Sequence, residues 1–218
     1  MPEDLMAQKL ELIQHTADLD IDSIVDLGGM WGVKGGYLDH ATALHNAHGL
    51  QVDYTANMPN HRNYSCDFAD WLSEILSHTI WGRFDMAILF DTLLHQICPV
   101  KVLKDLTVRC EKVILIAQPC LDQPRPVSEN IQFASQARWE ELHLDQLDVC
   151  ASEHGRPTTW TTAAWAWGQS PLWITATMKG FGWKPRYRSS CAMAQTGWIR
   201  EALAFVPAIS NDTQGETE

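Results

Sequence analysis

The sequence lacks any hydrophobic run that could cross a membrane, since no stretch approaches the roughly 18 consecutive apolar residues that a spanning helix needs. The first residues, MPEDLMAQKL, carry acidic side chains and lack the apolar core of a secretory signal, so none is expected. Internal repeats and low-complexity segments are also absent. With 45% hydrophobic and 20% charged residues, the composition excludes a disordered, collagen-like or coiled-coil chain.

Basic residues are scarce relative to acidic ones. The chain has 16 lysines and arginines against 27 aspartates and glutamates, which gives a formal net charge of −11. Because an acidic surface repels phosphate backbones, no nucleic acid is expected as a partner. A small-molecule substrate is expected instead, with no membrane association, and the oligomeric state is left open.

Closely spaced cysteine pairs, the usual sign of a metal or redox motif, are absent. The scattered thiols and the missing secretory signal predict a cytoplasmic protein with reduced cysteines. Among His40, His45 and His48, only the last two have the i, i+3 spacing of a helix face, so a solvated helix is favoured and no metal site is predicted. The six cysteines are Cys66, Cys98, Cys110, Cys120, Cys150 and Cys191.

What the sequence does contain is an alternation of helical and strand patterns. At about 100–200 residues per domain, residues 1–218 predict a single domain. Four apolar, strand-length runs alternate with helical patterns, which predicts an α/β fold with a mostly parallel sheet and helices on both faces. The predicted strands are 23–27, 50–54, 84–90 and 113–117, and the predicted helices are 5–19, 36–48, 66–78 and 92–110, the last with a break at Pro99.

The last third of the chain has a different pattern. Ser170 and Pro171 are typical of a helix start, and Gly180 of a helix end. Two further strands over 183–190 and 199–206 are separated by a short segment that contains Gly197, which predicts an antiparallel C-terminal hairpin.

Residues 121–168 are too many for a structureless loop in a compact domain, and we expect them to form a cap inserted over the substrate. The insertion is rich in tryptophan, whose indole rings could stack on an aromatic substrate or face a cation. The alternative is that these rings fill the small core of the cap. The candidate substrate-binding residues are Trp139, His143, Trp160, Trp165 and Trp167.

The most informative motif is VDLGGMWG at residues 25–32, which follows a predicted strand and precedes a helix. Glycines at such a turn let the backbone approach a ligand closely, and the helix N-terminus offers free N–H groups. Asp53 ends the second predicted strand, where an acid can accept hydrogen bonds from both hydroxyls of a ribose. Asp67 and Phe68 follow the next turn, where a carboxylate beside an aromatic ring can bind and stack a base.

On these residues the chain resembles the class I S-adenosylmethionine (SAM)-dependent methyltransferases. The resemblance covers about residues 20–120 and the C-terminal hairpin, and it implies a seven-stranded Rossmann-like sheet with SAM as cofactor. Residues 84–91, FDMAILFD, are similar to the family's fourth-strand motif, which implies that Asp91 lies near the sulfonium. Met30 stands where the family has a glycine. The residues implied to bind SAM are Asp26, Gly28, Gly29, Met30, Gly32, Asp53, Asp67, Phe68 and Asp91.

His95, four residues after Asp91, is the candidate catalytic residue, because a histidine there could act as a general base for the attacking hydroxyl or amine. The alternative is that it only packs against the cofactor pocket. The favoured function is methylation of a small molecule on oxygen, nitrogen or carbon. Two other functions stay open: another SAM-consuming reaction, such as intramolecular cyclisation or elimination, and a non-catalytic SAM-binding domain.

Overall fold

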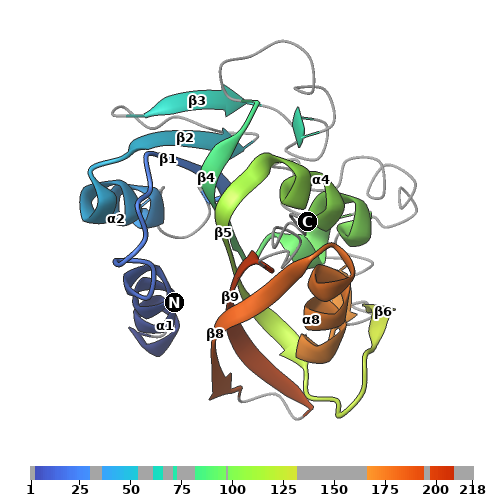
Figure 1. The fold of residues 1–218 in the computed structure, drawn as a ribbon. Helices are drawn as coiled ribbons and strands as arrows, with labels where there is room; N and C mark the ends of the chain where they lie inside the picture. Colours follow the sequence, from blue (N-terminus) through green and yellow to red (C-terminus); the bar gives the residue numbers. More distant parts are fainter. Residues whose placement is uncertain are drawn as a thin grey trace, which may run out of the picture.

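One twisted sheet organises the chain in the computed structural model, which describes residues 3–29, 36–53, 61–65, 71–72, 82–96, 98–131, 166–193 and 197–208 (Figure 1). Its strand order is β3-β2-β1-β4-β5-β9-β8. The first five of these strands pair in parallel, whereas β9 pairs antiparallel with both β5 and β8. The prediction of a mostly parallel sheet with antiparallel C-terminal strands is therefore confirmed. The strands are β1 (Ser23–Leu27), β2 (His48–Asp53), β3 (Arg62–Ser65), β4 (Phe84–Phe90), β5 (Cys110–Leu121), β8 (Trp183–Ala192) and β9 (Trp198–Pro207).

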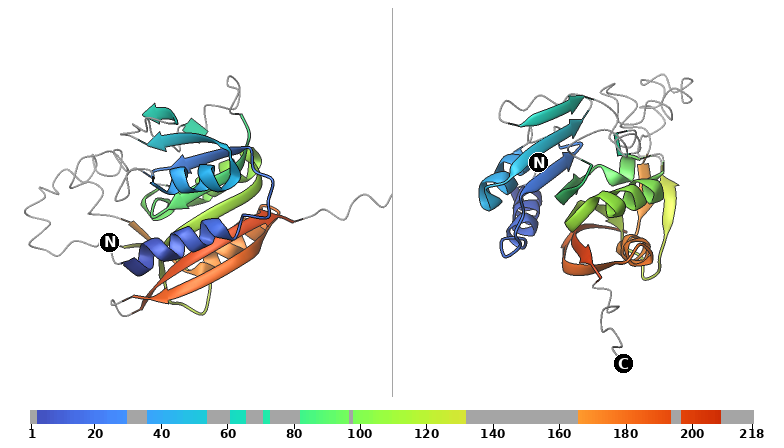
Figure 2. Two further views of the ribbon diagram at one scale, coloured as in Figure 1. Left: turned by 90° about the vertical axis from the view of Figure 1, so that its left-hand side faces the viewer. Right: turned by 45° about the horizontal axis from the view of Figure 1, so that its top comes forward.

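Helices cover both faces of this sheet (Figure 2). On one face, α1 (Glu3–Gln14) and α2 (Gly36–His45) pack against β1, β4, β5 and β9. On the other face lie α4 (Pro99–Arg109) and α8 (Pro171–Gly180). Successive side chains of a strand point to opposite faces. In β1, Ile24 is buried in the core on the side of α1 and α2, whereas Val25 and Leu27 are buried in the core on the side of α4 and α8. Because both faces are buried, the central strands have near-continuous apolar sequences.

The element boundaries differ from the predicted ones at several points. The first helix ends at Gln14 instead of residue 19, and α2 ends at His45 instead of residue 48. Gly49 directly follows the predicted helix 36–48, where a glycine is typical of a helix cap. It lies inside β2 instead, and the left-handed residue in the turn is Asn46, with φ 52°. The physical reason for glycine at position 49 is packing, because a Cβ atom there would lie 2.4 Å from the His61 ring.

The predicted helix over 92–110 is two elements. A short 3-10 turn, η1 (Leu93–His95), precedes α4, which begins at Pro99 because proline has no N–H to donate and favours the first turn of a helix. Of the predicted helix 66–78, only residues 71 and 72 are described, and both are helical. No helix in the described ranges is both long enough and apolar enough to span a membrane.

Both ends of the predicted insertion form a second, two-stranded sheet, in which β6 (Ser128–Ile131) pairs antiparallel with β7 (Ala166–Gln169). Residues 132–165 lie outside the described residues, so the cap stays a prediction.

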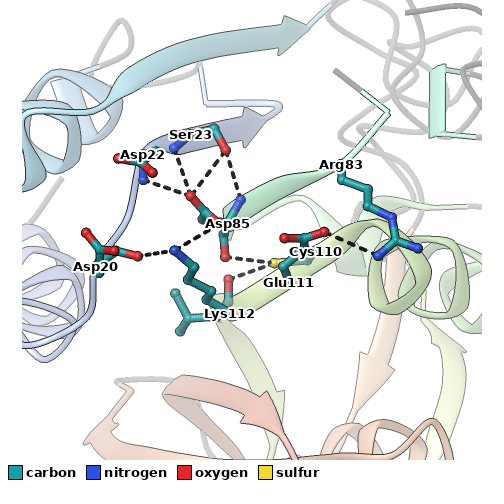
Figure 3. Close-up of polar contacts among 9 residues, drawn as sticks. Asp20, Asp22, Ser23, Arg83, Asp85, Cys110, Glu111 and Lys112 are labelled. Carbon is teal, nitrogen blue, oxygen red and sulfur yellow. Dashed lines mark hydrogen bonds and ion pairs between the residues drawn. The ribbon is translucent and has the colours of Figure 1, made fainter. Parts of the chain in front are cut away.

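A polar network at the amino ends of β1, β4 and β5 centres on Asp85 (Figure 3). One oxygen of its carboxylate, Oδ2, accepts hydrogen bonds from the backbone N–H groups of Asp22 at 2.8 Å and Ser23 at 3.3 Å. The other oxygen, Oδ1, lies 3.3 Å from the Lys112 ammonium. The Cys110 thiol donates to the carbonyl oxygen of Asp85 at 3.3 Å. This network joins the strands at their amino ends. Open α/β sheets bind ligands at the opposite end, beyond the carboxyl ends of the strands.

Candidate functional site

Three of the predicted acids lie at the carboxyl ends of three adjacent strands. Asp53 is the last residue of β2, Asp26 lies one residue before the end of β1, and Asp91 follows β4 directly. The chain leaves β1 through Gly28, which has φ 78° and donates its N–H to the Val52 carbonyl oxygen at 2.8 Å. The strand order β2-β1-β4 therefore gathers the three acids along one edge.

Asp26 is fully buried, and neither oxygen of its carboxyl group has a hydrogen-bond partner among the described residues. Gly29 folds directly over it, and a Cβ atom at position 29 would lie 1.9 Å from Oδ2 of Asp26. Burial, together with the nearby Asp53 carboxylate, raises the pKa of Asp26 to about 8, while Lys9 acts in the opposite direction. At neutral pH this group is therefore mostly a neutral acid that can both donate and accept hydrogen bonds.

Asp91 lies in a charged cluster that the sequence did not reveal. Its carboxylate contacts the Lys9 ammonium at 2.5 Å, and Nη2 of Arg200 contacts both of its oxygens, at 2.7 and 2.6 Å. Asp91 has a left-handed backbone with φ 58°, uncommon for a residue other than glycine. Its side chain is 32% exposed, whereas those of Lys9 and Arg200 are 2% and 5% exposed.

Lys9 reaches this cluster from α1 and Arg200 from β9. The Lys9 ammonium lies over the rings of Tyr37 and Phe90, 5.1 and 5.6 Å from their centroids. Burial lowers the pKa of Lys9, and the contact with Asp91 opposes that shift. One signal could have found this cluster: Arg200 interrupts WIREALAFVP, an otherwise largely apolar strand, and Lys9 is the only basic residue of α1.

A second polar group lies at the carboxyl end of β5. Gln118 donates its Nε2 hydrogen to Oε1 of Gln169 at 2.8 Å, and both side chains are fully buried. Cys120 is also buried, and burial raises its pKa to about 12, so its thiol stays protonated. Sequence reasoning missed this glutamine pair, because buried glutamines have no distinctive spacing.

Two further predicted residues lie in neighbouring elements. Trp167 is in β7, which adjoins η1, and His95 is the last residue of η1. The other predicted site residues lie outside the described residues, and their roles stay predictions. These are Met30, Gly32, Asp67, Phe68, Trp139, His143, Trp160 and Trp165. Within the described ranges, no three His, Cys, Asp or Glu side chains form a group that could hold a metal ion.

Comparison with known proteins identifies the fold of the chain. No family model and no curated protein matches the sequence. Among solved structures, the chain is similar to the 1,6-didemethyltoxoflavin-N1-methyltransferase of Burkholderia thailandensis, with a TM-score of 0.55 and 12% identity over 94% of this chain and 79% of that one. That protein was crystallised with S-adenosylhomocysteine (SAH). The chain has the fold of the class I SAM-dependent methyltransferases.

Two other methyltransferases show the same fold. The magnesium protoporphyrin IX methyltransferase of Synechocystis, solved with SAH, has a TM-score of 0.52 and 12% identity over 94% of this chain and 86% of that one. The N-methyltransferase NodS of Bradyrhizobium japonicum has a TM-score of 0.52 and 9% identity over 94% of this chain and 98% of that one. At these identities the likeness to methyltransferases concerns the fold.

Proposed function

We propose that the protein is a SAM-dependent methyltransferase that acts on a small molecule. The observation that carries the proposal is the buried Asp26 carboxyl group beneath Gly29, with both oxygens unpartnered among the described residues, in a fold shared with methyltransferases. A buried polar group without a partner is costly, so such a group is typical of a ligand site. The described cysteines Cys98, Cys110, Cys120 and Cys191 are free thiols, which supports a cytoplasmic location.

The residues at the strand ends fit SAM. Asp53 would accept hydrogen bonds from the two ribose hydroxyls, and Asp26 would bind polar atoms of the methionyl part. The left-handed Gly28 turns the chain sharply as it leaves β1, so the backbone at this strand end has a conformation that favours glycine. SAM would supply a methyl group on a positively charged sulfur, which is a good leaving group. The protein would therefore act mainly by holding the acceptor in line with that methyl group.

The first test is SAM binding by isothermal titration calorimetry. We expect Asp53→Ala to weaken SAM affinity by about 2–4 kcal/mol, because charged hydrogen bonds are lost and ligand hydroxyls are left unpaired. The control is Asp122→Ala, which removes an exposed aspartate just after β5 and should leave affinity unchanged. Unchanged affinity in Asp53→Ala would refute the role of Asp53. Wild-type protein that binds neither SAM nor SAH would refute the proposed function.

His95 is proposed as the general base. If it takes the proton from the acceptor, His95→Ala should lower turnover by about 10²–10⁴-fold at unchanged SAM affinity. A variant with weaker SAM binding and a preserved pH profile would instead indicate packing against the pocket. Mass spectrometry of the products identifies the reaction: methyl transfer yields SAH and a methylated acceptor, and cyclisation or elimination of SAM yields neither. A protein that binds SAM without any turnover is a binding domain.

A further inference from the structure

Asp91 has a backbone conformation that residues other than glycine seldom adopt. It directly follows β4, and its φ of 58° lies in the left-handed region. Such a conformation persists only when the surrounding structure holds it in place, and residues of this kind are concentrated at functional sites. The contacts that hold Asp91 therefore bear on function.

Contacts from β5, α1 and β9 hold Asp91 in place. Its N–H donates to the Ala117 carbonyl oxygen of β5 at 2.8 Å. Its carboxylate accepts from the Lys9 ammonium of α1 at 2.5 Å and from Nη2 of Arg200 in β9 at 2.7 and 2.6 Å. Because Lys9 and Arg200 are nearly buried, these ion pairs are screened much less than pairs at the surface, and they fix the side chain firmly.

The conformation of Asp91 sets the direction in which the chain leaves β4. η1 begins two residues later, at Leu93, and its last residue is His95. Leu93 is fully buried in the core on the side of α4 and α8, and η1 adjoins β5 and β7. A change of φ at Asp91 would therefore displace η1 from this packing and move His95 relative to the carboxyl end of β4.

We propose that Lys9 and Arg200 are positioning residues for His95: by holding Asp91 in its left-handed conformation, they fix η1 at the carboxyl end of β4. This inference rests on the proposed function, in which His95 is the general base. Lys9 and Arg200 act through Asp91 and touch neither the cofactor nor the acceptor. Their role matters because a general base can take a proton only from within hydrogen-bond distance.

The test compares two cluster variants, Lys9→Met and Arg200→Gln, with two matched controls, Lys112→Met and Arg186→Gln. Lys112 contacts an acid at the amino ends of the strands, and Arg186 pairs with an acid at the surface. Each control therefore makes the same replacement away from Asp91. Melting curves show which variants are folded. If Arg200→Gln does not fold, Arg200→Lys keeps the charge, loses the planar guanidinium and should show a smaller effect of the same kind.

Amide hydrogen exchange, measured by NMR, reports on the turn and on η1. The N–H of Asp91 is bonded to β5, and the N–H of Gln96 donates to the Leu93 carbonyl oxygen at 3.2 Å and closes η1. We expect both amides to exchange faster by about 10-fold or more in the two cluster variants. The Gly28 amide, which is bonded to the Val52 carbonyl oxygen at the end of β1, should keep its wild-type rate in all four variants.

A further NMR signal shows whether the effect reaches His95. The imidazole signal of His95, identified by its absence from His95→Gln, should shift in both cluster variants and keep its wild-type position in both controls. Asp91→Ala should have the same effects, because alanine lacks the carboxylate and disfavours a left-handed backbone. Adding Lys9→Met to Asp91→Ala should then change the exchange rates by less than about two-fold, since Lys9 acts through Asp91.

Unchanged exchange at Asp91 and Gln96 in folded cluster variants would overturn the proposal. So would an additive effect of Lys9→Met on Asp91→Ala, because Lys9 would then act on η1 without Asp91. A fall in SAH affinity of about 10-fold at unchanged exchange, measured by calorimetry, would show that the cations bind the cofactor directly and would also overturn it. Wild-type protein that binds neither SAM nor SAH would refute the proposed function alone, since the exchange measurements need no ligand and still decide whether the cluster holds η1.

Discussion

Asp26 and Asp85 are buried aspartates on adjacent strands, and their surroundings are opposite in kind. Asp85 accepts two backbone hydrogen bonds and contacts Lys112, so both of its carboxylate oxygens have partners. Asp26 has no such donors among the described residues. Asp85 therefore stabilises the sheet at the amino ends of the strands. Asp26 lowers the stability of the ligand-free protein at the carboxyl ends, where sheets of this kind bind ligands. Residues that cost stability are commonly retained for function.

This contrast gives a prediction about pH. The folded-state pKa of Asp26, about 8, lies above its ordinary value of 3.8, so the folded protein holds a proton that the unfolded chain releases. The stability contribution of Asp26 therefore falls as pH rises from about 4 to 8. Between pH 5 and pH 8, the unfolding free energy of Asp26→Asn should fall by roughly 1–3 kcal/mol less than that of the wild type. Urea denaturation at the two pH values measures this difference.

Asp85→Ala is the paired variant, and it should lower the stability of the folded protein. It leaves the N–H groups of Asp22 and Ser23 without their acceptor and should destabilise the protein by about 2–4 kcal/mol. An unchanged pH slope in Asp26→Asn would show that Asp26 is ionised in the folded protein at neutral pH.

At the scale of single elements, Ser170 joins α8 to the segment before β6. Its buried hydroxyl accepts hydrogen bonds from the N–H groups of Trp173 and Val127, at 3.1 and 3.0 Å, and donates to the Arg125 carbonyl oxygen at 3.0 Å. The first bond caps the helix, and the other two fix the chain that leads into β6.

Ser170→Ala should therefore cost more than the loss of an ordinary helix cap. We expect about 1–3 kcal/mol lower unfolding free energy in urea, because the N–H of Val127 also loses its buried partner. Thr107→Ala is the control: the Thr107 hydroxyl donates to the Lys104 carbonyl oxygen on an exposed helix face, and its removal should change stability by less than about 0.5 kcal/mol. Equal effects in both variants would contradict the second role of Ser170.

The order of helices and strands was predictable, because the spacing of apolar residues along the sequence reflects which side chains are buried. The central strands and α8 follow directly from apolar runs and from the Ser170–Pro171 start. Three features were not predictable. β3 is short and polar, and β5 continues through Pro119 because pairing with β9 on its other side overrides the local signal. Gly49 has the residue type of a helix cap and serves close packing instead.

The candidate site was also predictable only in part. Acids at strand ends were predictable from the alternation, since a parallel sheet brings its carboxyl ends together. The partners of Asp91 were not, because Lys9 and Arg200 lie 191 positions apart in the sequence and meet only when α1 packs on β9. Contacts between distant elements leave no periodic pattern in the sequence.

At the scale of the whole molecule, α1 joins the N-terminal region to the C-terminal hairpin. Gln8 donates to carbonyl oxygens of Ser189 and Arg200, Tyr187 bonds Glu11, and the ring of His15 stacks on that of Tyr187. Beneath these contacts, Leu12 and Ile13 are fully buried in the core cluster that also contains β4, β5 and β9 residues. Perturbing α1 should therefore weaken the hairpin as well.

Leu12→Ala tests this coupling. Removing a fully buried leucine side chain should lower the unfolding free energy by about 2–5 kcal/mol. If α1, β8 and β9 unfold as one unit, amide hydrogen exchange should speed up in β8 and β9 along with α1. Met6→Ala changes the same helix at a side chain that is 43% exposed and should leave exchange in the hairpin unchanged. Faster exchange confined to α1 would show that the helix opens independently.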